Sequence, residues 1–287
     1  MRLAFFDSGI GGLSVLHHAT KILPHEEFIF YADEDNVPYG TKSREEILSF
    51  VDEAFKFLVA QDVAAIVVAC NTATSVAVKK MREKYSLPII GMEPALKVAL
   101  DLFPAKKVLV TATAITITGE KIHRLIERLH AQKLAELKAL PMLVEFAERQ
   151  EFNSAAVENY LREEFATIDF KNFSSLVLGC THFNYFKDTL RKILPSHVKI
   201  LDGNEGTVNE LIRRTNLQPA PTVCPLFKSG GNEGTVNELI RRTNLQSART
   251  TALPDMKFFY SGRQVTDATE LERLQKFLQR LDRLEQV

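Results

Sequence analysis

Two short apolar stretches of this chain each end in a cysteine. Residues 63–70 read VAAIVVAC, and residues 174–180 read SSLVLGC. Strands with apolar residues at consecutive positions, rather than at alternate ones, are buried on both faces and are typical of parallel sheets covered by helices. We therefore predict an α/β fold in which each cysteine follows a buried strand.

The chain around each cysteine alternates strand and helix, as expected of parallel sheets. Expected strands in the first run lie at 2–6, 27–33 and 63–70, and in the second run at 106–113, 174–180 and 198–203. We therefore predict two pseudo-symmetric domains, each a mostly parallel sheet flanked by helices. The first is placed at 1–95 plus about 209–287, and the second at 96–208.

Composition excludes some classes of function. Lys plus Arg and Asp plus Glu both number 36, so the net charge is zero, which argues against a broad nucleic-acid surface. No apolar run reaches the length of a membrane span, and the start of the chain lacks a signal-peptide core. We expect a cytoplasmic protein. Its cysteines, Cys70, Cys180 and Cys224, are odd in number and widely spaced, which disfavours a disulfide framework.

One segment occurs twice. GNEGTVNELIRRTNLQ stands at 203–218 and again, letter for letter, at 231–246. Structural repeats diverge, so this identity indicates a recent duplication or an artefact. We expect no function for the second copy, and Cys224 lies in the spacer between the copies.

Polar residues follow several of the expected strands. The segments are FFDSGIGG (5–12), VVACNTA (67–73), VLVTATA (108–114), MLVEF (142–146) and LGCTHF (178–183). In open α/β sheets, ligands bind beyond the carboxyl ends of strands. The glycines of DSGIGG would let the backbone approach a ligand, but their spacing matches neither a dinucleotide fingerprint nor a P-loop. By itself this segment could equally be a turn capped by Asp7.

Each cysteine has neighbours suited to proton transfer. Cys70 ends a strand and begins a helix, a position that is expected to lower a thiol pKa from about 8.5. Cys180 is followed by Thr181 and His182, and imidazole titrates near neutrality. Either cysteine alone could be a small buried apolar residue. No second Cys or His stands at zinc spacing, so we predict no metal site.

Two cysteines in matched positions favour one kind of chemistry. A hydrolase needs a single nucleophile with a base, and a redox pair is usually C-x-x-C in sequence. Two thiols that face each other across a cleft can remove a proton from one face of a carbon acid and deliver a proton to the other. That arrangement inverts a stereocentre without a redox cofactor.

The motifs taken together resemble those of the bacterial glutamate racemases, in the aspartate/glutamate racemase family. The matching segments are FFDSGIGGLSV, YADEDNVPYG, VACNTA, GMEPA, PMLVE and LGCTHF, which cover about residues 1–205. The resemblance implies a homodimeric, cofactor-independent enzyme that interconverts L- and D-glutamate and supplies D-glutamate for peptidoglycan. It also implies an active site in the cleft between the domains.

Residue roles follow from the resemblance alone. Cys70 would take the proton from D-glutamate and Cys180 from L-glutamate. Asp7 would assist Cys70, while His182 and Glu145 would assist Cys180. The implied substrate contacts are Asp7, Ser8, Tyr39, Gly40, Asn71, Thr72, Thr181 and His182.

Some features depart from the family pattern or leave alternatives open. Asn184 stands where the family often has proline, and the repeat at 203–246 is a further departure. A racemase of aspartate or another amino acid, a lyase or hydrolase that uses one cysteine, and a catalytically silent binding protein remain alternatives. His17 and His18 fall on an expected helix and are predicted to be solvated.

Overall fold

The computed structural model describes residues 1–220 and 256–285 of the 287-residue chain. Its strands are β1 (Arg2–Asp7), β2 (Glu27–Ala32), β3 (Ala65–Val68), β4 (Ile89–Gly91), β5 (Lys107–Ala112), β6 (Ala135–Ala139), β7 (Phe173–Leu178), β8 (Lys199–Asp202), β9 (Met256–Tyr260) and β10 (Arg263–Gln264). The α-helices are α1 (Leu13–Ile22), α2 (Arg44–Val59), α3 (Asn71–Val76), α4 (Val78–Lys84), α5 (Leu96–Leu102), α6 (Ala114–Thr118), α7 (Glu120–Arg128), α8 (Met142–Glu148), α9 (Ala155–Phe165), α10 (Lys187–Ile193), α11 (Asn204–Thr215) and α13 (Ala268–Leu284). Short 3₁₀ helices are η1 (Ile10–Gly12), η2 (Tyr39–Thr41), η3 (Phe170–Asn172) and η4 (Thr181–Phe186).

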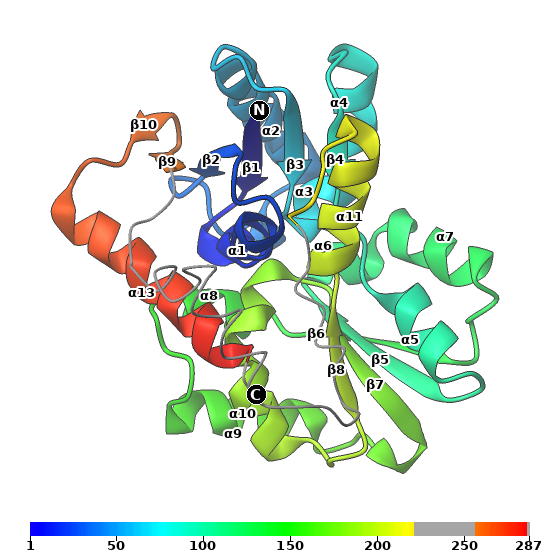
Figure 1. Ribbon diagram of the computed structural model, residues 1–287. Helices are drawn as coiled ribbons and strands as arrows, with labels where there is room; N and C mark the ends of the chain where they lie inside the picture. The colour runs from blue at the N-terminus through cyan, green and yellow to red at the C-terminus, as the bar shows by residue number, and fades with distance from the viewer. Residues whose placement is uncertain (221–255, 286–287) are drawn as a thin grey trace, which may run out of the picture.

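The strands form two sheets with the same internal order. The first sheet runs β10-β9-β2-β1-β3-β4, and the second runs β6-β5-β7-β8. Within β2-β1-β3-β4 and within β6-β5-β7-β8 every pair of neighbours is parallel. Thus β1 corresponds to β5 and β3 to β7, which confirms the predicted α/β fold of two pseudo-symmetric halves (Figure 1).

Alternate residues of the first sheet enter two different cores, because successive side chains of a strand point to opposite faces. Leu3 and Phe5 pack on the face covered by α1, whereas Ala4 and Phe6 pack on the face covered by α2. The α1 side is continuous with one face of the second sheet, through residues such as Leu176. This shared core holds the carboxyl ends of the two sheets together.

The C-terminal part of the chain joins the two halves. Strand β9 extends the first sheet beside β2, and α13 packs against both α1 and η4. Phe277 of α13 contacts the rings of Phe152 and Tyr185, with centroid separations of 5.8 and 5.2 Å. Helix α13, red in Figure 1, therefore packs against both halves.

Helix α2 begins at a capping signature in the sequence, Ser43 followed three residues later by Glu46. The Glu46 backbone N–H donates to Ser43 Oγ (3.2 Å), and the Ser43 backbone N–H donates to Glu46 Oε2 (2.8 Å). This reciprocal pair is a capping box, which satisfies backbone donors that the first helical turn leaves unpaired.

Two local predictions are wrong. Residues 137–148 (LKALPMLVEFAE) read as a strand running into a loop, and the strand part overlaps β6. Residues 142–148 instead form helix α8, because Leu143, Val144, Phe146 and Ala147 recur at helical spacing and face the core. His17 is 8% exposed rather than solvated, and its ring lies 2.8 Å from Asp282 of α13.

Other predictions fall partly outside the described residues. The first repeat copy forms α11, while the second copy and Cys224 lie outside the part of the chain that the structure describes. Among the described helices, none is long and apolar enough to cross a membrane.

Candidate active site

Cys70 lies at the junction of β3 and α3, at the carboxyl edge of the first sheet. It is the N-cap of α3, and its Sγ accepts a hydrogen bond from the Ala73 backbone N–H at 3.4 Å. Ser8 Oγ lies 3.6 Å from the same sulfur. The side chain is buried, with 5% exposed, so its surroundings rather than bulk water set its acidity.

Asp7 ends β1, the strand beside β3, and is fully buried. Its Oδ1 accepts hydrogen bonds from Ser8 Oγ and from the Gly9 backbone N–H, both at 3.2 Å. In a sheet ordered β2-β1-β3-β4, the gap between β1 and β3 is the topological switch point, where α/β proteins bind ligands. The fold therefore places Asp7 and Cys70 at that point.

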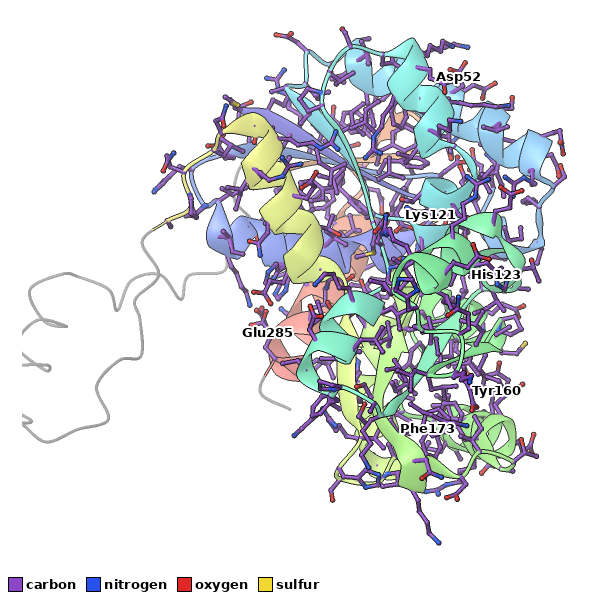
Figure 2. The ribbon with its side chains drawn as sticks, turned by 90° about the vertical axis from the view of Figure 1, so that its right-hand side faces the viewer. Asp52, Lys121, His123, Tyr160, Phe173 and Glu285 are labelled. Carbon is purple, nitrogen blue, oxygen red and sulfur yellow. The ribbon has the colours of Figure 1, made fainter. Side chains whose placement is uncertain are left out.

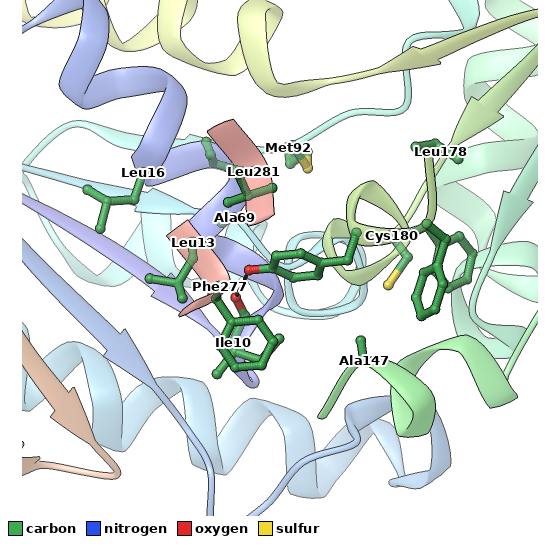
Figure 3. Packing of buried hydrophobic residues seen from close by; sticks show 14 of the residues in the cluster. Ile10, Leu13, Leu16, Ala69, Met92, Ala147, Leu178, Cys180, Phe277 and Leu281 are labelled. Atoms are coloured by element: carbon green, nitrogen blue, oxygen red, sulfur yellow. Dashed lines mark hydrogen bonds between the residues drawn. The ribbon is translucent and has the colours of Figure 1, made fainter. Parts of the chain in front are cut away.

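Cys180 occupies the equivalent position in the second sheet, directly after β7 and before η4. Its Sγ lies 3.8 Å from His182 Nδ1. The other ring nitrogen, His182 Nε2, lies 2.6 Å from Glu148 Oε1 of α8. Cys180 is 7% exposed and packs in the apolar cluster with Ala147 and Leu178 (Figure 3). The second thiol is thus backed by an imidazole and a carboxylate.

The segments that carry the two thiols touch each other. Thr181 Oγ1 donates to Asp7 Oδ2 at 2.9 Å, linking η4 to the end of β1. A Cβ atom at Gly11 would come within 2.4 Å of His182 Nδ1, so only glycine permits this approach of η1 to η4. The glycines of DSGIGG therefore make room for the opposite half of the protein, and not only for a ligand.

The groups around Cys70 make its thiol harder to ionise. Burial, and then the Asp7 carboxylate, raise the pKa of the Cys70 thiol to about 12. Burial also raises the pKa of Asp7, against the opposing effects of His182 and Thr181. The expected lowering of the Cys70 pKa by a helix N-terminus is therefore wrong, because the hydrogen bonds from the Ala73 N–H and the Ser8 hydroxyl do not offset burial and a neighbouring carboxylate.

His182 has the opposite character. Burial by itself would lower the pKa of His182, but the hydrogen bonds to Cys180 and Glu148 raise it well above the usual value. The raised pKa favours the imidazolium form of the ring. An imidazolium attracts negative charge on the atoms beside it, and Sγ of Cys180 is one of them.

Several of the predicted substrate contacts lie around this centre. Thr72 Oγ1 lies 2.9 Å from Thr113 Oγ1, which joins the helix after Cys70 to the end of β5. A Cβ at Gly40 would meet Thr113 at 3.3 Å, so the 39–41 turn also reaches the second half. Both polar atoms of the buried Asn71 amide have no hydrogen-bond partner among the described residues. This amide is therefore available to a bound molecule.

Tyr39 has a structural partner within its own loop. Its hydroxyl donates to Asp33 Oδ2 at 2.7 Å, and Asn36 Nδ2 and Ser261 Oγ donate to the same carboxylate. Asp33 follows β2 and organises the loop that leads to Tyr39. The sequence did not point to Asp33, Thr113 or Thr116. Thr113 Oγ1 donates to Thr116 Oγ1 at 3.1 Å.

Glu145 does not lie beside His182. Its side chain is 48% exposed, and its carboxylate lies 3.8 Å from Arg149. Glu148, one helical turn further along α8, holds His182 instead, and its Oε1 also accepts from the Ile10 backbone N–H at 3.2 Å. Recognising residues 142–148 as a helix would have pointed to Glu148, because its side chain follows the buried face of α8.

The arrangement can exchange protons from two sides. Two buried sulfur atoms, each beside a hydrogen-bonding side chain, occupy equivalent positions on two halves whose polar edges meet. Among the residues that the structure describes, no group of three or more His, Cys, Asp or Glu side chains is arranged to hold a metal ion. The fold and site together define an α/β protein with a buried thiol at the carboxyl edge of each of its two sheets.

Comparison with known proteins identifies the family. The model of the family described as Asp/Glu/hydantoin racemase matches residues 13–211, so the chain belongs to this family of isomerases. A glutamate racemase of Campylobacter concisus is 49% identical over 286 residues, covering 99% of this chain and 98% of that protein.

Two solved structures have the same fold. The glutamate racemase of Francisella tularensis, in complex with D-glutamate, matches with a TM-score of 0.70 and 26% identity over 96% of this chain and 92% of that one. The Escherichia coli glutamate racemase, in complex with L-glutamate and an activator, matches with a TM-score of 0.71 and 25% identity over 92% of this chain and 98% of that one.

Proposed function

We propose that this protein interconverts L- and D-glutamate without a cofactor, with Cys70 and Cys180 as the two proton-transfer groups. The observation that carries the proposal is the matched placement of the thiols. Each follows the third strand of a four-stranded parallel unit, β2-β1-β3-β4 in the first sheet and β6-β5-β7-β8 in the second. Thr181 and Asp7 link the two thiol-bearing edges by a hydrogen bond. The similarity to racemases with L-glutamate and with D-glutamate bound supports glutamate as the substrate.

In the direction from L- to D-glutamate, the Cys180 thiolate removes the α-proton and the Cys70 thiol delivers a proton to the opposite face. The charges at the site suit this direction. The protonated His182 ring stabilises the Cys180 thiolate, while burial and Asp7 keep Cys70 protonated. After one turnover Cys180 is a thiol and Cys70 is a thiolate, which is the state required to remove the α-proton of D-glutamate.

The carbanion needs stabilisation while neither proton is attached. Negative charge spreads onto the α-carboxylate, and hydrogen-bond donors fixed in a buried site stabilise that charge strongly. The Asn71 amide and the hydroxyls of Ser8 and Thr72 are the donors we assign to the substrate. Both thiols are almost fully buried, so substrate has to displace side chains from between the two halves before it reaches them.

The test is incubation with L-glutamate in D₂O without added cofactor. Circular dichroism follows the loss of optical activity, and NMR follows deuterium at Cα. We expect both to proceed together toward a racemic mixture. Exchange without inversion would mean that only one thiol works, and no exchange at all would contradict racemisation of glutamate.

A racemase of aspartate is the second candidate, which the family description itself includes. The same experiment with L-aspartate separates the two. We expect kcat/KM for glutamate to exceed that for aspartate. A higher kcat/KM for aspartate would make aspartate the substrate instead of glutamate, and the two-thiol chemistry would still hold.

The wider role is also our proposal. We infer a homodimeric cytoplasmic enzyme that supplies D-glutamate for peptidoglycan, supported by the resemblance of its motifs to the bacterial glutamate racemases. We also retain a domain division at 1–95 plus about 209–287 and 96–208, which the membership of strands in the two sheets supports. Size-exclusion chromatography with light scattering tests the dimer.

A further inference from the structure

Helix α13 brings a charged side chain to the surroundings of the second thiol. The helix packs against η4, and the exposed Glu285, which follows its last residue, is labelled in Figure 2 beside the faint red ribbon. Arg273 lies about three turns before that end, but its side chain is only 23% exposed. Arginine is rarely removed from water without partners, so this burial points to specific contacts.

Arg273 holds Glu148 at two atoms. Its Nη2 donates to the Glu148 backbone oxygen at 3.3 Å and to Oε2 of the same residue at 3.4 Å. The other carboxylate oxygen, Oε1, accepts from the Ile10 backbone N–H and lies 2.6 Å from His182 Nε2. One oxygen of Glu148 is therefore bound to α13, and the other faces the active-site histidine.

Arg273 is itself fixed by neighbours on its own helix. Its Nη1 donates to Glu270 Oε2 at 3.3 Å, one turn earlier. Its guanidinium lies 5.8 Å from the centre of the Phe277 ring, one turn later, and Phe277 is buried. The guanidinium is therefore held in one direction, toward the end of α8.

The same guanidinium balances negative charge around Glu148. The titratable groups that act on it are Glu34, Tyr260, Glu148 and Glu270. Burial, and then the Glu148 carboxylate, raise the pKa of Glu34 to about 7, and Arg273 opposes this rise. Neighbouring carboxylates repel each other when both are ionised. Arg273 therefore counters a repulsion that would otherwise move Glu148 away from its place.

We propose that Arg273 is a positioning residue for the second thiol, because it holds the Glu148 carboxylate against His182. The opposite ring nitrogen, His182 Nδ1, lies 3.8 Å from Cys180 Sγ. A hydrogen bond to one nitrogen of an imidazole fixes the orientation and protonation of the other. The consequence for catalysis rests on the proposed racemisation, whereas the contacts that lead from Arg273 to His182 do not.

The position of Arg273 in the chain gives α13 a part in the site. The segments that resemble the racemases end near residue 205, and the family model matches residues 13–211. Neither range includes α13. The helix that joins the two halves thus also completes the group of side chains behind Cys180.

Three variants separate this role from simple packing. Arg273→Met keeps an unbranched stem over Phe277 and a residue type that favours helix, but it removes the charge and the donors. Arg273→Lys keeps the charge. Lys276→Met is the matched control, because Lys276 on the same helix pairs with Glu272 at the surface. Circular dichroism checks that each variant is folded.

The first readout does not require activity. NMR of ring-labelled histidine gives the pKa of His182, whose signal is assigned with His182→Asn. Arg273→Met should lower that pKa by about one pH unit, because the Glu148 bond that raises it is weakened. Arg273→Lys should lower it less, and Lys276→Met should leave it unchanged. An unchanged or higher pKa of His182 in folded Arg273→Met would overturn the proposal.

The second readout is the racemisation of glutamate. Arg273→Met should lower kcat/KM roughly tenfold, the effect of one hydrogen bond to a charged group. Arg273→Lys should recover part of that loss, and Lys276→Met should stay within twofold. A loss of activity in Arg273→Met with the pKa of His182 unchanged would mean that Arg273 only packs, and would refute the proposal. If the unaltered protein does not racemise glutamate, the proposed function fails, while the NMR result still tests the link from Arg273 to His182.

Discussion

The surroundings of Cys70 and Cys180 differ although their positions in the two sheets are equivalent. Beside Cys70 stand a buried carboxylate, Asp7, and a hydroxyl, Ser8. Beside Cys180 stands His182, backed by Glu148. Burial and Asp7 raise the pKa of the Cys70 thiol, whereas the side chain beside Cys180 is a histidine whose own pKa is raised. The fold thus repeats the position of the thiol, while the neighbouring side chains give each thiol a different electrostatic environment.

Thermodynamics limits how this difference can be observed. L- and D-glutamate have equal free energies in water, so the equilibrium constant between them is one. The kcat/KM values of the two directions must then be equal at every pH and in every variant. Only proton exchange without inversion, or kcat and KM taken separately, can reveal which thiol serves which enantiomer.

Replacing either thiol should have the largest effect. We expect Cys70→Ser and Cys180→Ser each to lower kcat/KM roughly 10²- to 10⁴-fold, the usual contribution of a positioned acid or base. In D₂O, Cys70→Ser should still exchange the α-proton of L-glutamate, and Cys180→Ser that of D-glutamate. The same residual exchange of both enantiomers in both variants would break the assignment of faces.

Helix α8 provides the next comparison. Glu148→Gln should lower kcat/KM roughly 10- to 100-fold, because a hydrogen bond to a charged group contributes about 1.5–3 kcal/mol. Glu145→Gln, three residues away and facing solvent, should stay within twofold. Steady-state kinetics on L-glutamate measures both. A large loss of kcat/KM in Glu145→Gln, with none in Glu148→Gln, would mean that Glu145 assists Cys180, as the resemblance implies.

Asp7 should act on activity and on stability in opposite directions. Asp7→Asn should lower activity roughly tenfold, because the carboxylate beside Cys70 is lost. The folded-state pKa of Asp7 is raised above its ordinary value of 3.8, so the folded protein keeps a proton that the unfolded chain releases. Stability therefore falls as pH rises from about 3.8 toward the folded pKa, by at most about 1.4 kcal/mol per pH unit.

Asn does not titrate, so the stability of the Asp7→Asn variant should not show the part of the fall with rising pH that Asp7 causes. Urea unfolding at intervals between pH 4 and pH 7 measures the difference from the unaltered protein. Parallel pH profiles for the two proteins would mean that Asp7 is not held protonated by burial.

The smallest effects should come from the hydroxyls between the halves. Thr113→Val should lower the free energy of unfolding by about 1 kcal/mol, since it removes a buried hydrogen bond. Thr72→Val should cost about the same and also raise KM for glutamate, because we assign its hydroxyl to the substrate. Denaturation and kinetics on both variants separate the two roles, and an unchanged KM in Thr72→Val would remove Thr72 from the substrate contacts.

Much of the fold follows from local sequence. Consecutive apolar residues in 63–70 and 174–180 predict strands buried on both faces, and these are β3 and β7. The capping pair of Ser43 and Glu46 predicts where α2 begins. The failure at residues 142–148 is also local, because a short apolar run with proline before it fits a strand or a helix until its packing is known.

The sequence by itself determined the residue types of the site: two cysteines after buried strands, an aspartate after β1, and a histidine two residues beyond the second cysteine. Tertiary structure alone decided which carboxylate holds His182, why Gly11 must be glycine, and that Cys70 is more strongly protonated than a helix N-cap predicts. These depend on burial and on contacts between residues more than 30 positions apart, such as His182 with Glu148. Periodicity in sequence reports which face of an element is buried, but it carries no information about the charge or the atom that faces it from the other half.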